Sequence, residues 1–163
     1  MALAAGRAAF ESLKAEAARL REDNERLEKQ AKQREKENQQ IKIQEAQAQA
    51  RNVQTEEMGP VHAYLFKFPE PVGLVVLRSC IDAIQKTDPQ AVISFADSSG
   101  CIVVGSGDAA QKQGISARQV IDFWTRKANG SGGGRESMAQ GRIEKLNFFS
   151  MQEYKNFFQE RLK

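Results

Sequence analysis

The sequence predicts an α+β protein: a long N-terminal helical or coiled-coil arm, followed by a small globular domain with a short sheet packed by helices. Two observations support this prediction. Residues 3–57 consist mainly of the helix formers Ala, Glu, Gln, Lys and Arg, and Gly6 is the only glycine or proline among them. Eleven of the twelve aromatic residues come after residue 57, where they can build a hydrophobic core. We therefore assign residues 1–57 to the arm and residues 58–163 to the globular domain.

The first part of the arm carries a seven-residue repeat, typical of a coiled-coil seam. Asn24 at an a position resembles the polar residue that fixes the register of coiled coils. After Ala31 the seam decays, because Arg34 and Asn38 occupy core positions. A solvated helical spacer, a helical hairpin and self-association through residues 10–31 all remain possible. The seam consists of leucines at every seventh position and of their companions, namely Leu13, Leu20 and Leu27 with Phe10, Ala17, Asn24 and Ala31.

In the second part of the chain, short apolar runs alternate with turn residues. Met58-Gly59-Pro60 is expected to end the arm helix, because glycine and proline together cannot continue it. Ser116 is a helix N-cap by type and position. The expected elements are a strand at 61–68, a helix from Pro71 to the break at 87–89, strands at 91–96 and 101–104 joined by the turn 97–100, a helix after Ser116, a glycine-dense loop at 129–141 and a helix at about 150–162.

The composition excludes several classes of protein. Charged residues make up 28% of the chain and the mean hydropathy is −0.56, and no apolar stretch is long enough to predict a transmembrane helix. The Ala-rich start leads into Glu11 and Glu16, which argues against a signal or transit peptide. Cys80 and Cys101 do not form a disulfide framework. We therefore expect a cytoplasmic protein with no membrane partner.

Positive charge and glycine concentrate in the same region. Residues 111–145 contain seven basic and three acidic residues, and residues 130–141 contain five of the twelve glycines. Glycines let backbone N–H groups approach a phosphate, and Arg135 follows them with a side chain that can bind phosphate bidentately. The alternatives are a tight packing loop and an ordinary solvated basic face. The basic residues of this region are Lys112, Arg118, Arg126, Lys127, Arg135, Arg142 and Lys145.

The sequence offers little for catalysis. His62 is the only histidine and lies in a predicted strand, where we expect it to be packed or at the strand edge. Cys80 and Cys101 are expected to be small buried hydrophobic residues. Together with His62 they include no closely spaced ligand pair for zinc. We therefore predict no catalytic residue, no metal and no cofactor.

The stretch from Ala91 to Gly141 resembles the C-terminal domain of alanyl-tRNA synthetases, the DHHA1 domain. The resemblance rests on the strand Cys101-Ile-Val-Val-Gly105-Ser106, on the loop 128–135 (ANGSGGGR) and on the Met-Ala-Gln that follows. The family's loop reads Gly-Gly-Gly-Arg-Pro-Asp-Met-Ala-Gln, and this chain departs from it at Glu136 and Ser137. The resemblance extends more loosely over residues 58–163, and the arm is similar to the helical linker of those enzymes.

The resemblance implies a non-catalytic module that binds a tRNA, namely alanine tRNA, and holds it for aminoacylation and editing carried out elsewhere. The motifs of those two activities are absent, so the chain is either a fragment of a synthetase or a free-standing copy of its tail. One alternative is an assembly module acting through the coiled coil. Another is the substrate-binding domain of a DHH-type oligonucleotide phosphoesterase, whose loop usually has His where Arg135 stands. The nucleic-acid-binding residues predicted from charge and resemblance together are Lys112, Arg126, Lys127, Gly132, Gly133, Gly134, Arg135, Gln140 and Arg142.

Overall fold

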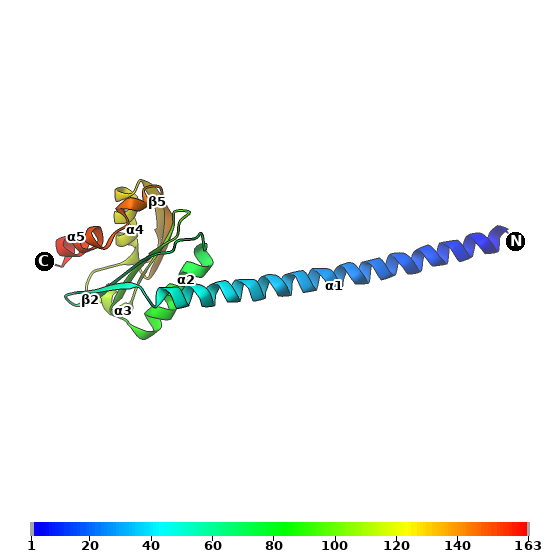
Figure 1. Cartoon of the computed structure of the whole chain (residues 1–163), viewed down its shortest axis with the longest axis horizontal. Coiled ribbons are helices and arrows are strands. Elements are labelled where there is room, and N and C mark those ends of the chain that lie inside the picture. The colour runs from blue at the N-terminus through cyan, green and yellow to red at the C-terminus, as the bar shows by residue number, and fades with distance from the viewer. Residues whose placement is uncertain (1, 163) are drawn as a thin grey trace. The chain divides into compact units, whose positions relative to one another are not determined.

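The computed structural model describes residues 2–162, which form two compact units, one ending at Ile41 and the other starting at Lys42. Helix α1 (Ala2–Ala50) is uninterrupted (Figure 1), as its helix-forming composition predicts. The helix ends at Ala50, earlier than the predicted stop at Met58. The N–H groups of Arg51 and Asn52 bond to carbonyls three residues back, which tightens the last turn. Residues 54–58 are a strand rather than helix, so this part of the prediction was wrong.

The second unit contains one six-stranded sheet in the order β1-β2-β3-β4-β6-β5. Only β2 and β3 are parallel, and helix α2 makes the crossover between them. The other four neighbouring pairs are antiparallel. The strands are β1 (Gln54–Met58), β2 (Val61–Lys67), β3 (Ala91–Ala96), β4 (Cys101–Ser106), β5 (Gly130–Gly134) and β6 (Met138–Ile143).

Three of these strands were predicted, and three were not. β1 has the sequence QTEEM and lies at one edge of the sheet, so it lacks the apolar alternation that reveals a buried strand. The predicted glycine loop is a hairpin: β5, with the sequence GSGGG, pairs with β6 at the other edge. Glycine is a poor strand former. The strand conformation of β5 is therefore stabilised by its pairing with β6 rather than by the propensity of its own residues.

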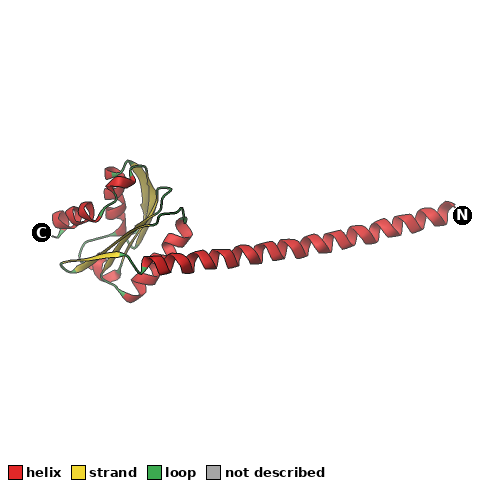
Figure 2. Ribbon diagram, in the orientation of Figure 1, coloured by secondary structure: helices red, strands yellow, loops and turns green. Residues whose placement is uncertain are grey.

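Helices cover both faces of the sheet (Figure 2). On one face, α4 and α5 contribute Trp124 and Tyr154, both fully buried. The Trp124 Nε1–H donates to Ser94 Oγ at 3.0 Å, and the Tyr154 hydroxyl donates to the Val92 carbonyl at 2.8 Å. On the other face, α2 and the last turns of α1, with Ala46, enclose a second apolar cluster. These contacts confirm the predicted α+β architecture.

The helix ends follow the capping rules of the sequence. Ser116 accepts a hydrogen bond from the Gln119 N–H at 3.2 Å, and the Gln119 side chain bonds back to the Ser116 N–H, which completes a capping box. Ser150 caps the C-terminal helix in the same way, by accepting the Glu153 N–H. No helix within residues 2–162 is both long and apolar enough to cross a membrane. The remaining helices are α2 (Leu74–Thr87), α3 (Asp108–Lys112), α4 (Ala117–Lys127), the 3-10 helix η1 (Leu146–Phe148) and α5 (Met151–Arg161).

Candidate nucleic-acid interface

The β5–β6 hairpin presents two faces, and the register of the strands decides which side chain lies on which. Gly132 faces α4, because a Cβ built on it would lie 3.1 Å from Cγ1 of Ile121. Side chains alternate along a strand, and residues directly opposite in an antiparallel pair share a face. Gln140 pairs with Gly133, so both lie on the other face, toward α2. The Arg78 guanidinium of α2 donates to Gln140 Oε1, which confirms this assignment.

A depression of about 490 Å³ lies on this α2 side, at the turn end of the hairpin. It brings together four of the predicted residues, Gly133, Gly134, Arg135 and Gln140. It also includes Arg78, which the sequence did not single out. The turn is held in place because the Arg135 N–H donates to the Met138 carbonyl at 2.9 Å and the Gln85 side chain donates to the Ser137 carbonyl at 3.2 Å. The complete lining is Arg78, Asp82, Gly133, Gly134, Arg135, Met138, Ala139 and Gln140.

A second depression, of about 630 Å³, lies at the other end of the hairpin and contains Arg142. Arg142 follows Gln140 by two residues on β6, so the two side chains share a face and are separated by about 7 Å of strand. The Arg142 guanidinium donates to the Ser99 carbonyl at 3.4 Å. Asn129 and Glu144 also line this depression and hydrogen-bond to each other. We call the residues Arg78, Gly133, Arg135, Gln140 and Arg142 the hairpin face.

Three guanidinium groups of the hairpin face are exposed and not neutralised. Arg78, Arg135 and Arg142 are all exposed. Within residues 2–162, none of the four ion pairs includes them. The sequence did not indicate Arg78, because a single charged residue on a predicted helix carries no signal of a binding site. Only the packing of α2 beside β6 brings it to the hairpin.

The other predicted cations lie elsewhere. Arg126 and Lys127 end α4 and line a depression of about 340 Å³ together with Glu160 and Arg161 of α5. Lys127 Nζ forms an ion pair with Glu153 at 3.1 Å, so its charge is partly neutralised. Lys112 is exposed at the end of α3 and lines none of these depressions. The nine predicted residues therefore do not converge on one site.

The glycines of the hairpin have different roles. A Cβ on Gly132 would lie 2.8 Å from the Gln140 carbonyl oxygen, and one on Gly134 would lie 2.6 Å from the Ala139 Cα. Both contacts are with backbone, so these two glycines are needed for close packing of the strands. A Cβ on Gly133 would have no neighbour within 4 Å. Gly133 is therefore the glycine of the triplet whose surface is open to a ligand.

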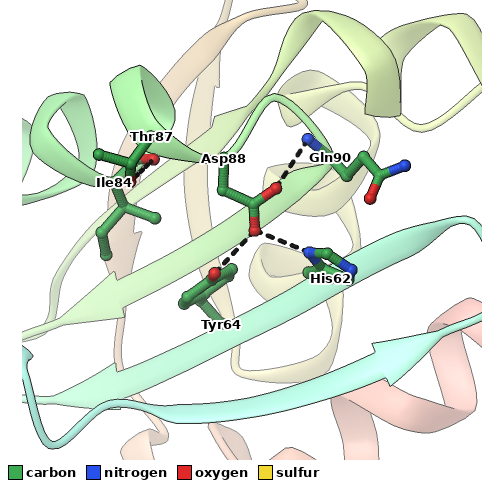
Figure 3. A network of polar contacts seen from close by, with 6 residues as sticks. All are labelled: His62, Tyr64, Ile84, Thr87, Asp88 and Gln90. Atoms are coloured by element: carbon green, nitrogen blue, oxygen red, sulfur yellow. Dashed lines mark hydrogen bonds and ion pairs between the residues drawn. The ribbon is translucent and has the colours of Figure 1, made fainter.

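A polar network connects β2 to the end of α2, away from the hairpin. The Asp88 carboxylate lies between two β2 side chains (Figure 3): His62 Nδ1 is 2.8 Å away and the Tyr64 hydroxyl donates at 2.7 Å. The Gln90 N–H donates to the other carboxylate oxygen at 3.0 Å. Burial, the hydrogen bond to Asp88 and its charge together raise the pKa of Tyr64 to about 12. Burial alone would raise the pKa of Asp88, but the bonds from Tyr64, His62 and Gln90 hold it below its ordinary value.

Asp88→Asn is expected to lower the free energy of unfolding by about 1–2 kcal/mol at neutral pH, because the amide cannot accept all these hydrogen bonds. Since the pKa of Asp88 is lowered in the folded state, its contribution is fully present above about pH 4 and is lost as the pH falls through the folded pKa. Urea unfolding at neutral and acidic pH measures both effects. Thr87→Ala, which removes an exposed bond to the Ile84 carbonyl on the same turn, is the control and should change stability by less than about 0.5 kcal/mol. Equal stability of Asp88→Asn and wild type would contradict the prediction.

Comparison with known proteins gives three similarities. The alanine–tRNA ligase of Corynebacterium jeikeium (strain K411) is 33% identical over 93 residues, which are 54% of this chain and 10% of the ligase; the chain thus spans about a tenth of that relative. The solved C-Ala domain of alanyl-tRNA synthetase from Aquifex aeolicus has a TM-score of 0.58 at 23% identity, covering 68% of this chain and 99% of that one. A solved DHH domain, from a member of the s1p family of ribosomal proteins, has a TM-score of 0.54 at 15% identity, covering 78% of this chain and 31% of that one. The fold of this chain is therefore similar to the folds of both solved structures.

The family assignment comes from the globular unit. Residues 63–163 match the family model of the DHHA1 domain. The matched region runs from β2 to the C-terminus and includes α2 and the complete β5–β6 hairpin, and so the whole hairpin face. It is well over half of the chain, and the chain therefore belongs to the DHHA1 domain family.

Proposed function

We propose that this chain is a non-catalytic tRNA-binding module of the alanyl-tRNA synthetase type, which holds tRNA while aminoacylation and editing are carried out elsewhere. The observation that carries the proposal is the hairpin face. The exposed guanidinium groups of Arg78 and Arg135 line one depression with the open backbone of Gly133, and that of Arg142 lies at the other end of the hairpin; within residues 2–162 none of the three is in an ion pair. Guanidinium groups bind phosphate bidentately, and glycine lets the sugar–phosphate backbone come close. The similarity to an alanine–tRNA ligase supports tRNA as the ligand.

The binding is electrostatic in this proposal. Arg135 and Arg142 contact phosphates at the two ends of the hairpin, and Arg78 and Gln140 contribute between them. Arg126, Lys127 and Lys112 are secondary contacts, because they lie on other elements and Lys127 already pairs with Glu153. A surface of this kind reads the position of the phosphate backbone, so folded RNA is recognised mainly by shape.

Arg135→Ala and Arg142→Ala are each expected to weaken tRNA binding by about three- to tenfold and to reduce the salt slope by about one, because each removes one phosphate contact. The measurement is a binding series between about 50 and 200 mM salt with the full chain. Lys86→Ala removes one exposed positive charge from the end of α2 without touching the hairpin face, and it should leave affinity nearly unchanged. Unchanged affinity in both arginine variants, each shown to be folded, would rule out the hairpin face as the binding surface.

Competitors identify the ligand in the same series. A preference for folded tRNA over a single strand and a duplex of equal length supports a tRNA module. Equal binding to all three indicates a general basic surface. No binding even at low salt would refute a nucleic-acid function for this chain.

A second candidate is the substrate-binding domain of a DHH-type oligonucleotide phosphoesterase. The fold similarity to a solved DHH domain favours it. Arg135 argues against it, because the loops of those phosphoesterases usually have histidine there. Tighter binding of short oligonucleotides than of tRNA, in the competition described above, would select this function.

A further inference from the structure

A carboxylate lies among the arginines of the hairpin face. Asp82 of α2 lines the depression at the turn end of the hairpin together with Arg78 and Arg135, and it is the acidic residue of that lining. Its side chain is exposed, and no ion pair within residues 2–162 includes it. We propose that Asp82 accepts a hydrogen bond from a ribose 2′-hydroxyl of the bound RNA, so that the module recognises RNA by its sugar as well as by its phosphates. This inference rests on the proposed function.

The fold itself gives the Asp82 carboxylate no partner. A carboxylate stabilises a helix near the N-terminal end, but Asp82 lies about two turns beyond the start of α2. Arg78 and Lys86 lie one turn away on either side, where a helical ion pair could form, yet neither forms one with Asp82. The Arg78 guanidinium donates to Gln140 of β6 instead. The carboxylate oxygens of Asp82 are therefore available to a ligand.

A negative charge in this position opposes the binding of phosphate unless the ligand also donates a hydrogen bond to it. The phosphate oxygens of nucleic acids only accept hydrogen bonds, whereas the 2′-hydroxyl of ribose can donate one, and this group distinguishes RNA from DNA. Asp82 and Arg78 are one helical turn apart, about 6 Å along α2. With a phosphate bound to Arg78, the attached ribose is within reach of Asp82. The resulting bond is charge-assisted, and hence stronger than one between neutral groups.

The depression at the other end of the hairpin lacks such a free acceptor. Its acidic residue is Glu144, which lines it together with Arg142. The Glu144 carboxylate already accepts a hydrogen bond from the Asn129 side-chain amide. Of the two carboxylates in these depressions, Asp82 is thus the one that the described part of the chain leaves open. We therefore assign recognition of the sugar to the turn end of the hairpin.

The test compares two RNAs that differ in this donor. One is an alanine tRNA, and the other has the same sequence with fluorine in place of every 2′-hydroxyl. Fluorine keeps the sugar conformation of RNA but donates no hydrogen bond. Binding of the full chain to both RNAs at one salt concentration gives a ratio of affinities. The decisive quantity is the change of this ratio between wild type and a variant, because any difference in folding between the two RNAs cancels in that comparison.

Asp82→Ala is expected to lower the ratio by about three- to tenfold, because it removes the acceptor. At the same time it should strengthen binding of the fluorinated RNA by about twofold, because a repelling charge is lost. Asp82→Asn keeps an acceptor oxygen without the charge, and its ratio should lie between those of wild type and Asp82→Ala. Circular dichroism checks that each variant keeps its fold.

Glu136→Ala is the matched control. Glu136 is exposed and follows Arg135 in the hairpin turn, but it does not line the depression. Its loss also removes a negative charge near the bound phosphates, so Glu136→Ala should strengthen binding of both RNAs alike and leave their ratio unchanged. This variant shows what simple electrostatic repulsion does without a contact to the sugar.

The outcomes separate this proposal from the function on which it rests. A ratio that falls in Asp82→Ala but not in Glu136→Ala supports it. A ratio that Asp82→Ala leaves unchanged overturns it, because Asp82 then acts only by repulsion or contacts a base instead of the sugar. In that case both RNAs still bind, and the proposed tRNA-binding function stands. If wild type binds neither RNA, the proposed function and this inference are both refuted.

Discussion

Asp97→Ala is expected to lower the free energy of unfolding by about 3–5 kcal/mol, which is among the largest effects that one side chain can have. Asp97 is fully buried. One carboxylate oxygen accepts the N–H groups of Val72 and Gly73, each at 3.1 Å. The other accepts the N–H and hydroxyl of Ser99, at 3.0 and 2.6 Å, and the N–H of Cys101, at 3.1 Å. Removing the carboxylate leaves five donors without their acceptor, three of them on the partly buried residues Val72, Gly73 and Cys101.

The position of Asp97 explains why the loss is large. Gly73 is the N-cap of α2 and has no side chain to accept the first N–H groups of the helix, so Asp97 caps α2 from the end of β3. A negative charge at this end is also stabilised by the helix dipole. The same carboxylate shapes the turn between β3 and β4 through Ser99 and Cys101. Its loss therefore loosens α2 and the central hairpin together.

The contribution of Asp97 depends on pH. Burial by itself would raise its pKa, but the hydrogen bonds from Ser99, Gly73, Val72 and Cys101 together lower it below the ordinary value. Because the folded pKa lies below the unfolded value of about 3.9, the stabilisation is fully present above that pH and is lost as the pH falls through the folded pKa. Asp97→Asn should flatten this acid dependence.

Urea unfolding of wild type, Asp97→Ala and Asp97→Asn at neutral and acidic pH measures these effects. Ser99→Ala is the control, because it removes one of the five donors, and it should lower stability by about 1 kcal/mol. A loss of less than about 1 kcal/mol in Asp97→Ala would mean that water replaces the carboxylate and that the cap is dispensable.

Gly132→Ala is expected to lower the free energy of unfolding by about 2–3 kcal/mol, whereas Gly133→Ala should change it by less than about 0.5 kcal/mol. The added methyl at Gly132 would lie against the Gln140 carbonyl and the Gly141 Cα, which are backbone atoms of β6 and cannot move aside. The methyl at Gly133 would project into open space. The pair is well matched, because the two residues are adjacent on one strand and receive the same change.

Thermal unfolding and tRNA binding of the two variants separate structure from recognition. Under the proposed function, Gly133→Ala keeps its stability but weakens tRNA binding, because its methyl lies where the phosphate backbone approaches. Equal losses of stability in both variants would show that the triplet is needed only for packing. Unchanged tRNA affinity in a stable Gly133→Ala protein would place the close approach elsewhere.

The regular helices and the buried strands were predictable from the sequence. The composition of residues 3–50, the apolar runs of β2, β3 and β4, and the Ser116 cap each carry a local signal, and the structure confirms them. β1 and β5 carry no such signal, because one is polar and the other is nearly all glycine. Their strand conformation comes from hydrogen bonds to neighbours that are themselves well specified.

The candidate site, like the fold, was only partly predictable from the sequence. The sequence indicated Arg135, Gln140 and Arg142 through the charge of the region and the family motif, and the structure places all three on the hairpin face. It does not place Lys112, Arg126 or Lys127 there, because charge counting along the chain contains no information about which side of the sheet a residue occupies. Arg78 belongs to the site because α2 brings it next to Gln140 of β6, a residue 62 positions away in the sequence.

By itself, the sequence determined the helical arm, the α+β class and the family, because helix propensity, apolar patterning and a motif are local properties. Asp97 shows what only the tertiary structure decided. In the sequence it is an ordinary turn residue, yet it caps a helix that begins more than twenty positions earlier. The difference between Gly132 and Gly133 was likewise invisible, since both are glycines in one run. Contacts between distant segments decide which donors are buried and which atoms a methyl group would meet, and they exist only once the sheet and helices have packed.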